Sequence, residues 1–582
     1  MATNWQTTLT KRQAEGRQQR LWTAPIPMEK AAGWLVLLPV AFFFVYPLWK
    51  LVILSVKTEA GLGLGIFSEL LADARTWSAV YHSLTAAVLS TVLALVIGVS
   101  LAWLCAYTDI RFKGAIHVMA MLPLLIPSYV MTLAWTQMAG PAGVLNRFAS
   151  WLMGFPVELW NVYGLDGIIV VMGLSHYPLV YMLTLSVLYR IPKELEWAAR
   201  SSGASSRNVL RQVTLPLALP GIASGGLLAF ISGLDNFGIP AFLGIPAGIP
   251  VLSTLIYEQV IGFGPSAFGR ASVLSILLGI IALGGTGLQW LLLRKSRVDQ
   301  TSAEDRSVRY TLGKKRFLAE GAVGLFLLIT SFLPLLSMAS TAFIKAYGLP
   351  FLAENLTWKH FLFVLRDHAG TREALGNSLM LAGLTGALCL VVGTLFAYWR
   401  VQRPHKLGKM LEGAVSLPYA LPGMVVGLAM ILTWMEPIPG WQPGIYGTVW
   451  MILIAYVTRF FILQVKSSTV SILQVGREVE EAARISGGKL WTRWGRILLP
   501  LYAPGMLTGL FLVMLTAFTE LTISSLLWSS GSQTIGVVIF GFEQAGSTTL
   551  STALSTLIVT AILILLAIGG LWKRYWQRRV EG

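Results

Sequence analysis

Twelve long apolar stretches are the feature of this 582-residue chain that most limits its possible folds. About 20 apolar residues make one helix that spans a bilayer, and the stretches reach this length. Their Leu, Val, Ile, Ala and Phe content favours helices over the alternating pattern of barrel strands. They lie near residues 33–56, 83–107, 115–139, 167–189, 215–242, 271–293, 317–343, 376–399, 410–435, 444–465, 499–528 and 549–572. The sequence therefore predicts an all-α integral membrane protein with about twelve transmembrane helices.

Composition and charge placement agree with a membrane setting. Hydrophobic residues make up 55% of the chain and charged residues 12%, unlike the balance of soluble domains. A net charge of +17 is also typical of nucleic-acid-binding proteins, but most of the 44 Lys and Arg lie in segments that are inside when the N-terminus is cytoplasmic. This is the positive-inside distribution of membrane proteins. We therefore expect both termini in the cytoplasm, a lipid bilayer around the chain and no nucleic-acid partner.

The chain consists of two homologous halves. Residues 194–221 recur as residues 478–505, with the same residue at 12 of 28 positions. Further matches upstream keep a constant offset, as expected for an internal duplication. We predict a cytoplasmic tail at 1–30, a first half of six spans at 31–293, a linker at 294–316, a second half of six spans at 317–573 and a cytoplasmic tail at 574–582.

The recurring segment lies in the longest inner loop of each half, between its fourth and fifth spans. These loops occupy residues 190–216 and 474–500. Pro192 suits the first turn of a short helix, and Gly203 and Gly487 are expected to end the two helices because glycine readily adopts positive φ. Each loop then leads through a proline into the next span.

The second loop resembles the EAA motif of binding-protein-dependent ABC importer permeases. It reads Glu481-Ala482-Ala483, three residues and Gly487, and then Leu499-Pro500. The first loop has Trp197 where the motif has its glutamate. The resemblance implies that both loops are coupling helices that dock on an ATPase. The residues it assigns to this role are Glu196, Ala198, Ala199, Gly203, Glu480, Glu481, Ala482, Ala483 and Gly487. The alternative is that the small residues only pack each helix onto the ends of its own spans.

The same resemblance implies the rest of the assembly. It consists of two copies of a cytoplasmic ABC ATPase subunit and a periplasmic or extracellular substrate-binding protein, in a bacterial inner (plasma) membrane. Among fused two-half permeases, the length and layout are most similar to the ferric-iron type. Thiamine, 2-aminoethylphosphonate and polyamine importers are the related alternatives for the cargo.

No catalytic site is expected in this chain. Gly487-Gly488-Lys489 is followed by Leu490, so no phosphate-binding loop of the form G-x4-G-K-[ST] is present in the sequence. The two cysteines, Cys105 and Cys389, do not correspond between the halves, and the six histidines form no ligand pattern. The chain is therefore expected to be a permease and not an enzyme, with no metal site and no cofactor, while ATP and Mg are bound by the partner ATPase.

Polar residues inside apolar spans are costly and mark functional or paired positions. Asp235 and Asn236 lie near the end of the fifth span, Glu520 lies at the matching place in the eleventh, and Arg459 lies in the tenth. They are candidates for a translocation path with an acidic lining for a cation. The alternative is a structural ion pair or an interfacial cap.

Two further interpretations stay open at this point. The proline pairs at residues 123 and 127 and at residues 418 and 422 are either gating kinks or bends of packed helices. A secondary transporter driven by an ion gradient can also have twelve spans in repeated halves. Such a carrier has no evident need for the matched inner loops, which favour the ATP-driven importer.

Overall fold

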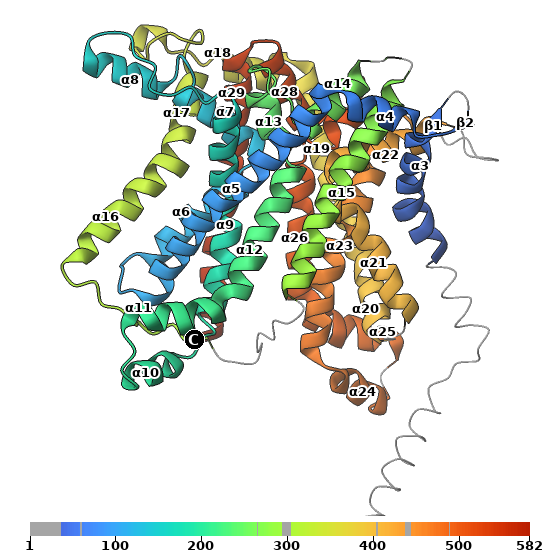
Figure 1. The fold of residues 1–582 in the computed structure, drawn as a ribbon. Helices are drawn as coiled ribbons and strands as arrows, with labels where there is room; N and C mark the ends of the chain where they lie inside the picture. Colours follow the sequence, from blue (N-terminus) through green and yellow to red (C-terminus); the bar gives the residue numbers. More distant parts are fainter. Residues whose placement is uncertain are drawn as a thin grey trace, which may run out of the picture.

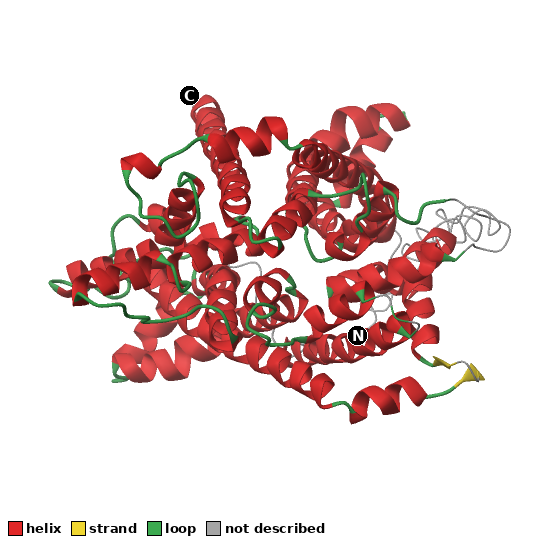
Figure 2. Cartoon of the chain, turned by 90° about the horizontal axis from the view of Figure 1, so that it is seen from above, coloured by secondary structure: helices red, strands yellow, loops and turns green. Residues whose placement is uncertain are grey.

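The protein is helical almost throughout. The computed structural model describes residues 37–58, 61–262, 264, 266–293, 304–402, 406–436, 444–487 and 489–581. The tail predicted at 1–30 and the first ten residues of the linker lie outside these ranges. Figure 2 shows helices across the whole molecule and one small antiparallel hairpin at its rim, formed by β1 (Lys57–Thr58) and β2 (Gly61–Leu62).

Residues up to 293 form the first half, coloured blue to green in Figure 1. Its elements are η1 (Ala41–Val45), α3 (Tyr46–Ser55), α4 (Gly65–Ala72), α5 (Ala74–Tyr107), α6 (Lys113–Leu125), α7 (Ser128–Ala139), α8 (Val144–Met153), α9 (Leu165–Leu188), α10 (Lys193–Ser201), α11 (Ser206–Val209), η2 (Leu210–Thr214), α12 (Leu215–Asp235), α13 (Gly238–Leu243), α14 (Leu252–Ile261) and α15 (Ala267–Leu293).

The second half repeats this order. Its elements are α16 (Lys315–Leu327), η3 (Leu328–Phe332), α17 (Leu333–Ala342), η4 (Ala353–Asn355), α18 (Lys359–Leu362), η5 (Phe363–Asp367), α19 (Ala369–Leu388), η6 (Cys389–Gly393), α20 (Thr394–Gln402), α21 (Lys406–Ala420), α22 (Gly423–Met435), α23 (Val449–Val475), α24 (Arg477–Ile485), α25 (Leu490–Thr492), η7 (Arg493–Leu498), α26 (Leu499–Phe518), α27 (Ser524–Leu527), α28 (Ile535–Gln544) and α29 (Thr548–Glu581).

Each half is a bundle whose long helices approach closely at small residues. In the first half α9 packs against both α5 and α12. A Cβ added to Gly98 of α5 would lie 2.9 Å from the Tyr177 carbonyl oxygen, and one added to Gly225 of α12 would lie 2.7 Å from the Val180 Cα. Glycine at these positions lets the backbones meet, which is a common packing mode for helices in lipid.

The first long helix of each half packs against a helix of the other half. Helix α3 of the first half packs on α22 of the second, and α17 of the second half packs on α7 of the first. A 2.8 Å ion pair between Lys50 of α3 and Glu436, directly after α22, supports the first of these contacts. The halves therefore form one interlocked body.

The number of spans agrees with the prediction if each helix pair that is bent at a proline counts as one span. Among the described residues, ten helices are long and apolar enough to cross a bilayer, or up to twelve if each of two bent pairs is one span. This confirms the all-α membrane fold. The spans predicted at 115–139 and 410–435, with kinks or bends at their prolines, are sharply bent pairs: α6 and α7 meet at 103° and α21 and α22 meet at 106°.

Proline chemistry explains both breaks. Pro127 and Pro422 are the N-caps of α7 and α22. A proline disfavours helical geometry at the preceding residue, and Ile126, directly before Pro127, has an extended ψ of 135°. By contrast, Pro123 and Pro418 lie inside α6 and α21. Only the second proline of each pair ends a helix.

Three other predicted spans differ at their ends. Helix α12 ends at Asp235 and is followed by the short α13, so the span predicted at 215–242 is interrupted. Similarly, α26 ends at Phe518 and not near residue 528. Helix α23 begins at Val449 and continues to Val475, ten residues beyond the predicted end.

Candidate functional site

The two loop helices predicted from the repeat, α10 and α24, lie at the same end of the molecule (Figure 1). Both end at a glycine with positive φ, 87° at Gly203 and 76° at Gly487. The Ala204 N–H donates to the Ala199 carbonyl at 3.0 Å, which closes the last turn of α10. A Cβ added to either glycine would meet no atom within 4 Å. The glycines therefore serve the turn and leave open space beside each helix.

Both helices expose small and apolar side chains. Ala198 of α10 and Ala482 of α24 are exposed. Trp197 and Glu481, which occupy equivalent places, are also exposed, and Ile485 at the end of α24 is 87% exposed. Ala199 is half-buried and Ala483 is buried, so the second alanine of each pair faces the body. The exposed alanine, Ala198 or Ala482, is the feature that the two helices share, and exposed apolar side chains beside it are typical of a surface that binds a partner.

The two glutamates that precede this exposed face point inward. Glu196 is 1% exposed, and Glu480 is partly buried. Both carboxylates contact side chains of the same chain. The structure thus places Glu196 and Glu480 beneath the helices and not on the outer surface with Ala198 and Ala482.

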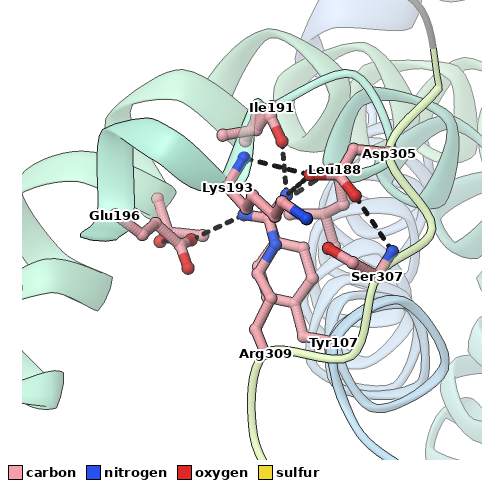
Figure 3. A network of polar contacts seen from close by, with 9 residues as sticks. Tyr107, Leu188, Ile191, Lys193, Glu196, Asp305, Ser307 and Arg309 are labelled. Atoms are coloured by element: carbon pink, nitrogen blue, oxygen red, sulfur yellow. Dashed lines mark hydrogen bonds and ion pairs between the residues drawn. The ribbon is translucent and has the colours of Figure 1, made fainter. Parts of the chain in front are cut away.

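Glu196 is held by a residue of the linker between the halves (Figure 3). Arg309 Nη1 lies 3.0 Å from Glu196 Oε1, and the Thr214 hydroxyl donates to the same oxygen at 2.5 Å. The Arg309 guanidinium covers the Tyr107 ring at 4.1 Å and donates to the Ile191 carbonyl. A buried charge that is paired and hydrogen-bonded in this way is tolerated where an isolated one is not.

A second linker residue binds the start of α10. Asp305 Oδ2 accepts a hydrogen bond from the Lys193 N–H, the first of the helix, at 3.0 Å, and the Asp305 N–H donates to the Tyr189 carbonyl at 2.6 Å. Burial raises the pKa of Asp305, but hydrogen bonds from Ser307 and Lys193 together with the Arg309 charge outweigh it, so the pKa is lowered. We call residues 304–310 the strap. An acidic residue at a helix N-terminus also favours the helix electrostatically.

Glu480 has partners from its own half. The Tyr398 hydroxyl and the Gln402 amide each donate to its carboxylate at 2.8 Å. Arg493 Nη1, on the segment after α24, lies 3.8 Å from Glu480 Oε1. The N-cap of α24 is Gly476, which has no side chain to cap the helix. Helix α24 is therefore held in place by side chains of its own half.

A polar cluster joins the halves where the end of α12 meets the interior of α23. Arg459 Nη2 of α23 lies 2.5 Å from Asp235 Oδ2 of α12. The other Asp235 oxygen accepts from the Gly423 N–H at 2.6 Å, at the start of α22, and Arg459 Nη1 donates to the Leu421 carbonyl at 3.2 Å. Asp235 thus binds a cation and a helix N-terminus of the other half at once.

Asn236 and Glu520 make equivalent contacts in the two halves. The Asn236 side chain accepts from the Ile239 N–H at 2.9 Å, beside α13. Glu520 accepts from the Ile523 N–H at 2.8 Å and the Ser524 N–H at 3.1 Å, beside α27. Each residue caps the short helix that follows a broken span. A place for these four polar residues on a translocation path stays a prediction.

Comparison with known families identifies this architecture. The family model described as "Binding-protein-dependent transport system inner membrane component" matches residues 94–298 and again residues 389–582. The two matches cover most of the chain and fall on the two halves. The chain belongs to this family.

As a member of this permease family, the protein is a multi-pass inner membrane component of a transport system and not an enzyme, and the family has no cofactor. No group of three or more His, Cys, Asp or Glu side chains that could hold a metal ion occurs within the described ranges.

Similar permeases carry different names. The ferric transport system permease protein FbpB of Actinobacillus pleuropneumoniae is 24% identical over 77% of this chain, which spans 64% of that protein's length. Fe(3+)-transport system permease protein FbpB 2 of Haemophilus influenzae is 24% identical over 87% of this chain and 90% of its own length. PhnU of Salmonella choleraesuis, whose name assigns it to 2-aminoethylphosphonate transport, is 29% identical over 44% of this chain and 93% of its own length.

Among solved structures, that of a bacterial alginate ABC transporter in complex with an alginate pentasaccharide-bound periplasmic protein is a weak match. It has a TM-score of 0.38 and 18% identity, and covers 48% of this chain and 99% of the matched chain. A likeness at this level does not inform the permease's function.

Arg309 and Asp305 are the residues of this site that the sequence pattern did not indicate. Both lie in a segment that reads as a charged linker, with no apolar periodicity to suggest packing. One signal was present in the repeat. The second loop has Arg493 where the first has Val209, so the first glutamate lacks the cation that its counterpart has nearby.

Proposed function

We propose that this permease is the transmembrane subunit of an ATP-driven importer, with α10 and α24 as its two coupling helices. The observation that carries the proposal is the pair of matched helices at one end of the molecule, each with exposed small residues and a glycine stop. Two equivalent surfaces suit two copies of one partner. Closure of an ATPase pair would then move both halves together.

The proposed assembly has three kinds of component. Two cytoplasmic ABC ATPase subunits bind ATP and Mg and dock on α10 and α24. An external binding protein delivers the solute to the opposite end of the permease. This places both termini of the chain in the cytoplasm, which agrees with the distribution of Lys and Arg along the sequence.

The proposed cargo is ferric iron. Two of the relatives named above are ferric transport permeases, and Asp235 and Glu520 place carboxylates beside broken helices within the membrane-spanning body. Carboxylate oxygens suit a hard cation. Thiamine, a polyamine and 2-aminoethylphosphonate are the alternatives, the last supported by the PhnU relative.

Substitution of the two glycines tests the docking role. In G203D and G487D a side chain and a charge project into the open space beside each coupling helix. We expect each single variant to lower ATP-driven uptake of radiolabelled ferric iron into vesicles that hold the permease, its ATPase and its binding protein. A lost contact worth about 1.4 kcal/mol reduces docking affinity tenfold.

A matched control separates docking from backbone strain. Gly154, the C-cap of α8, has φ 73° and nothing within 4 Å of an added Cβ, but it lies at the other end of the molecule. G154D should keep normal uptake. If G203D, G487D and their double variant all retain uptake, the docking role is wrong. If the wild-type permease accumulates the ion with an ion gradient and no ATPase, the protein is a secondary transporter.

The cargo is tested separately. The binding protein co-expressed with the permease is purified and titrated with ferric ion, thiamine, 2-aminoethylphosphonate and a polyamine. Retention of ferric ion alone supports the proposed cargo. Retention of one of the organic solutes overturns that assignment and leaves the importer class in place.

A further inference from the structure

We propose that Arg309 of the linker is a positioning residue for the first coupling helix. This inference rests on the proposed function of α10. Under this proposal the linker joins the two halves and, through Arg309, also orients the first docking surface. The chemistry is electrostatic: one guanidinium fixes the buried carboxylate from which the exposed alanine face of α10 takes its orientation.

The first step of the argument is the burial of the ion pair. The Arg309 and Glu196 side chains are 2% and 1% exposed. Water cannot replace either partner at this depth, so the position of the carboxylate follows that of the guanidinium. Glu196 lies in the first turn of α10, two residues before Ala198. Any shift of Arg309 therefore changes where Ala198 and Trp197 face.

The second step is the way in which Arg309 itself is held. The N–H groups of Arg309 and Tyr310 donate to the Tyr107 carbonyl at 2.9 and 3.0 Å, at the end of the long helix α5. Beyond the strap, Asp109 accepts from the Leu312 N–H at 2.9 Å and pairs with Arg316 at 3.3 Å. The guanidinium is thus carried by backbone fixed to α5, and the strap continues directly into α16 of the second half.

The third step is the comparison of the repeats. In the second half the cation near Glu480 comes from Arg493, and the equivalent residue of the first half is Val209, which is fully buried. The residue equivalent to Gln402 is Tyr107, whose ring stacks under Arg309 and does not bind the carboxylate. The linker therefore supplies the cation that the first loop lacks.

A cross-linking experiment measures the contact of each helix with the ATPase separately. A benzophenone maleimide is attached to A198C or to A482C in the full permease–ATPase complex, and photocross-linking to the ATPase is quantified. Both native cysteines are buried, so labelling of the introduced cysteine dominates. We expect R309A to lower cross-linking from A198C at least fivefold and to leave cross-linking from A482C unchanged. ATP hydrolysis stimulated by the binding protein should fall in parallel.

Rescue distinguishes positioning from a general structural role. The variant V209R/R309A moves the cation to the place that Arg493 has in the second half, and we expect it to restore at least half of the A198C cross-linking. The control R306A alters an exposed strap arginine paired with Glu304 and should keep wild-type values. If R309A is poorly folded, the same cross-linking is measured in V209R/R309A and in E196Q/R309A. Neither of these double variants leaves a buried charge without a partner.

Each outcome decides between the proposals. No cross-linking from either site in the wild-type background contradicts the docking role of the helices. Strong cross-linking from A198C that R309A and E196Q/R309A leave intact, with normal ATP hydrolysis, overturns the role of Arg309 while the docking role stands. Equal losses at A198C and A482C also overturn it, because they indicate a global defect.

Discussion

The proposed coupling helices α10 and α24 share one repeated sequence but are held to the body by different parts of the chain. In the first half, the partners of the buried glutamate come from the linker and from Thr214. In the second half, they are the Tyr398 hydroxyl, the Gln402 amide and Arg493. The helices themselves keep the same length, the same glycine stop and the same exposed alanine.

This difference shows which features a duplicated helix must keep. Under the proposed docking role, the exposed face has to fit two copies of the same partner, which explains why both helices keep the same exposed alanine. The inner contact only has to satisfy one carboxylate, and several donors can do so. The fusion of two halves in one chain adds a segment between them, and that segment is available to serve one of the sites.

The largest expected effect comes from the buried glutamates. E196A removes the nearer carboxylate from the buried Arg309 guanidinium and leaves it with Asp305 at 3.6 Å; breaking a buried pair of this kind costs about 3–5 kcal/mol. E480A removes hydrogen bonds from partly exposed neighbours and should cost about 1–3 kcal/mol. Hydrogen exchange of the α10 and α24 amides in the purified permease measures both effects on the helices concerned.

Either result tells whether α10 and α24 depend equally on their buried glutamates. Loss of protection in α10 by E196A, with a smaller loss in α24 by E480A, is the expected pattern. Equal losses would mean that the strap adds nothing beyond what the second half achieves with its own residues. The exposed variant E481A is the control and should leave the protection of α24 unchanged.

Most of the fold was predictable from the sequence because lipid leaves few options. Each apolar stretch has to satisfy its backbone within a helix, so the number of spans and the position of the inner loops followed from hydropathy. The helix breaks after residues 125 and 420 were not predicted. Proline is tolerated inside membrane helices, as Pro123 and Pro418 are here, so its presence alone does not tell a kink from a break.

The site was predictable in part. The repeat located α10, α24 and their glycine stops, because a sequence kept twice marks a shared function. The inward orientation of Glu196 was not predictable, since in the sequence a glutamate near the alanine pair is indistinguishable from a residue of the same surface. Its partner lies 113 positions further along, in a segment with linker composition. Contacts of this kind depend on tertiary structure and leave no local pattern.

The pair that joins the halves gives the next largest effect. D235L leaves Arg459, 5% exposed, without its carboxylate, and we expect a loss of about 3 kcal/mol, at the low end for a broken buried ion pair because Asp235 is partly exposed. The double variant D235L/R459M removes both charges and should recover most of this loss. Thermal unfolding of the purified permease in detergent measures both.

The repeat equivalents of Asp235 and Arg459 provide the comparison. They are Thr519 and Ser175, which carry no charge. The Thr519 hydroxyl donates to the Leu515 carbonyl of its own helix, and the buried Ser175 hydroxyl has no hydrogen-bond partner among the described residues. S175A and T519A should therefore each cost about 1 kcal/mol or less. A loss from S175A as large as that from D235L would show that the two sides of the interface are equivalent and that the ion pair adds nothing of its own.

The smallest effect tests the Thr214 hydroxyl, which donates to the buried Glu196 carboxylate. The Thr214 hydroxyl donates to Glu196 at 2.5 Å, whereas its repeat equivalent in the second half is the buried Leu498. T214V keeps the shape and removes the donor, so it should cost about 1 kcal/mol. The reverse exchange, L498T, removes apolar contact from a buried site and should also destabilise its half, by about 1–2 kcal/mol. If each half instead tolerates the other's residue, measured by the same thermal unfolding, the two anchors are interchangeable and the asymmetry of the loops has no energetic basis.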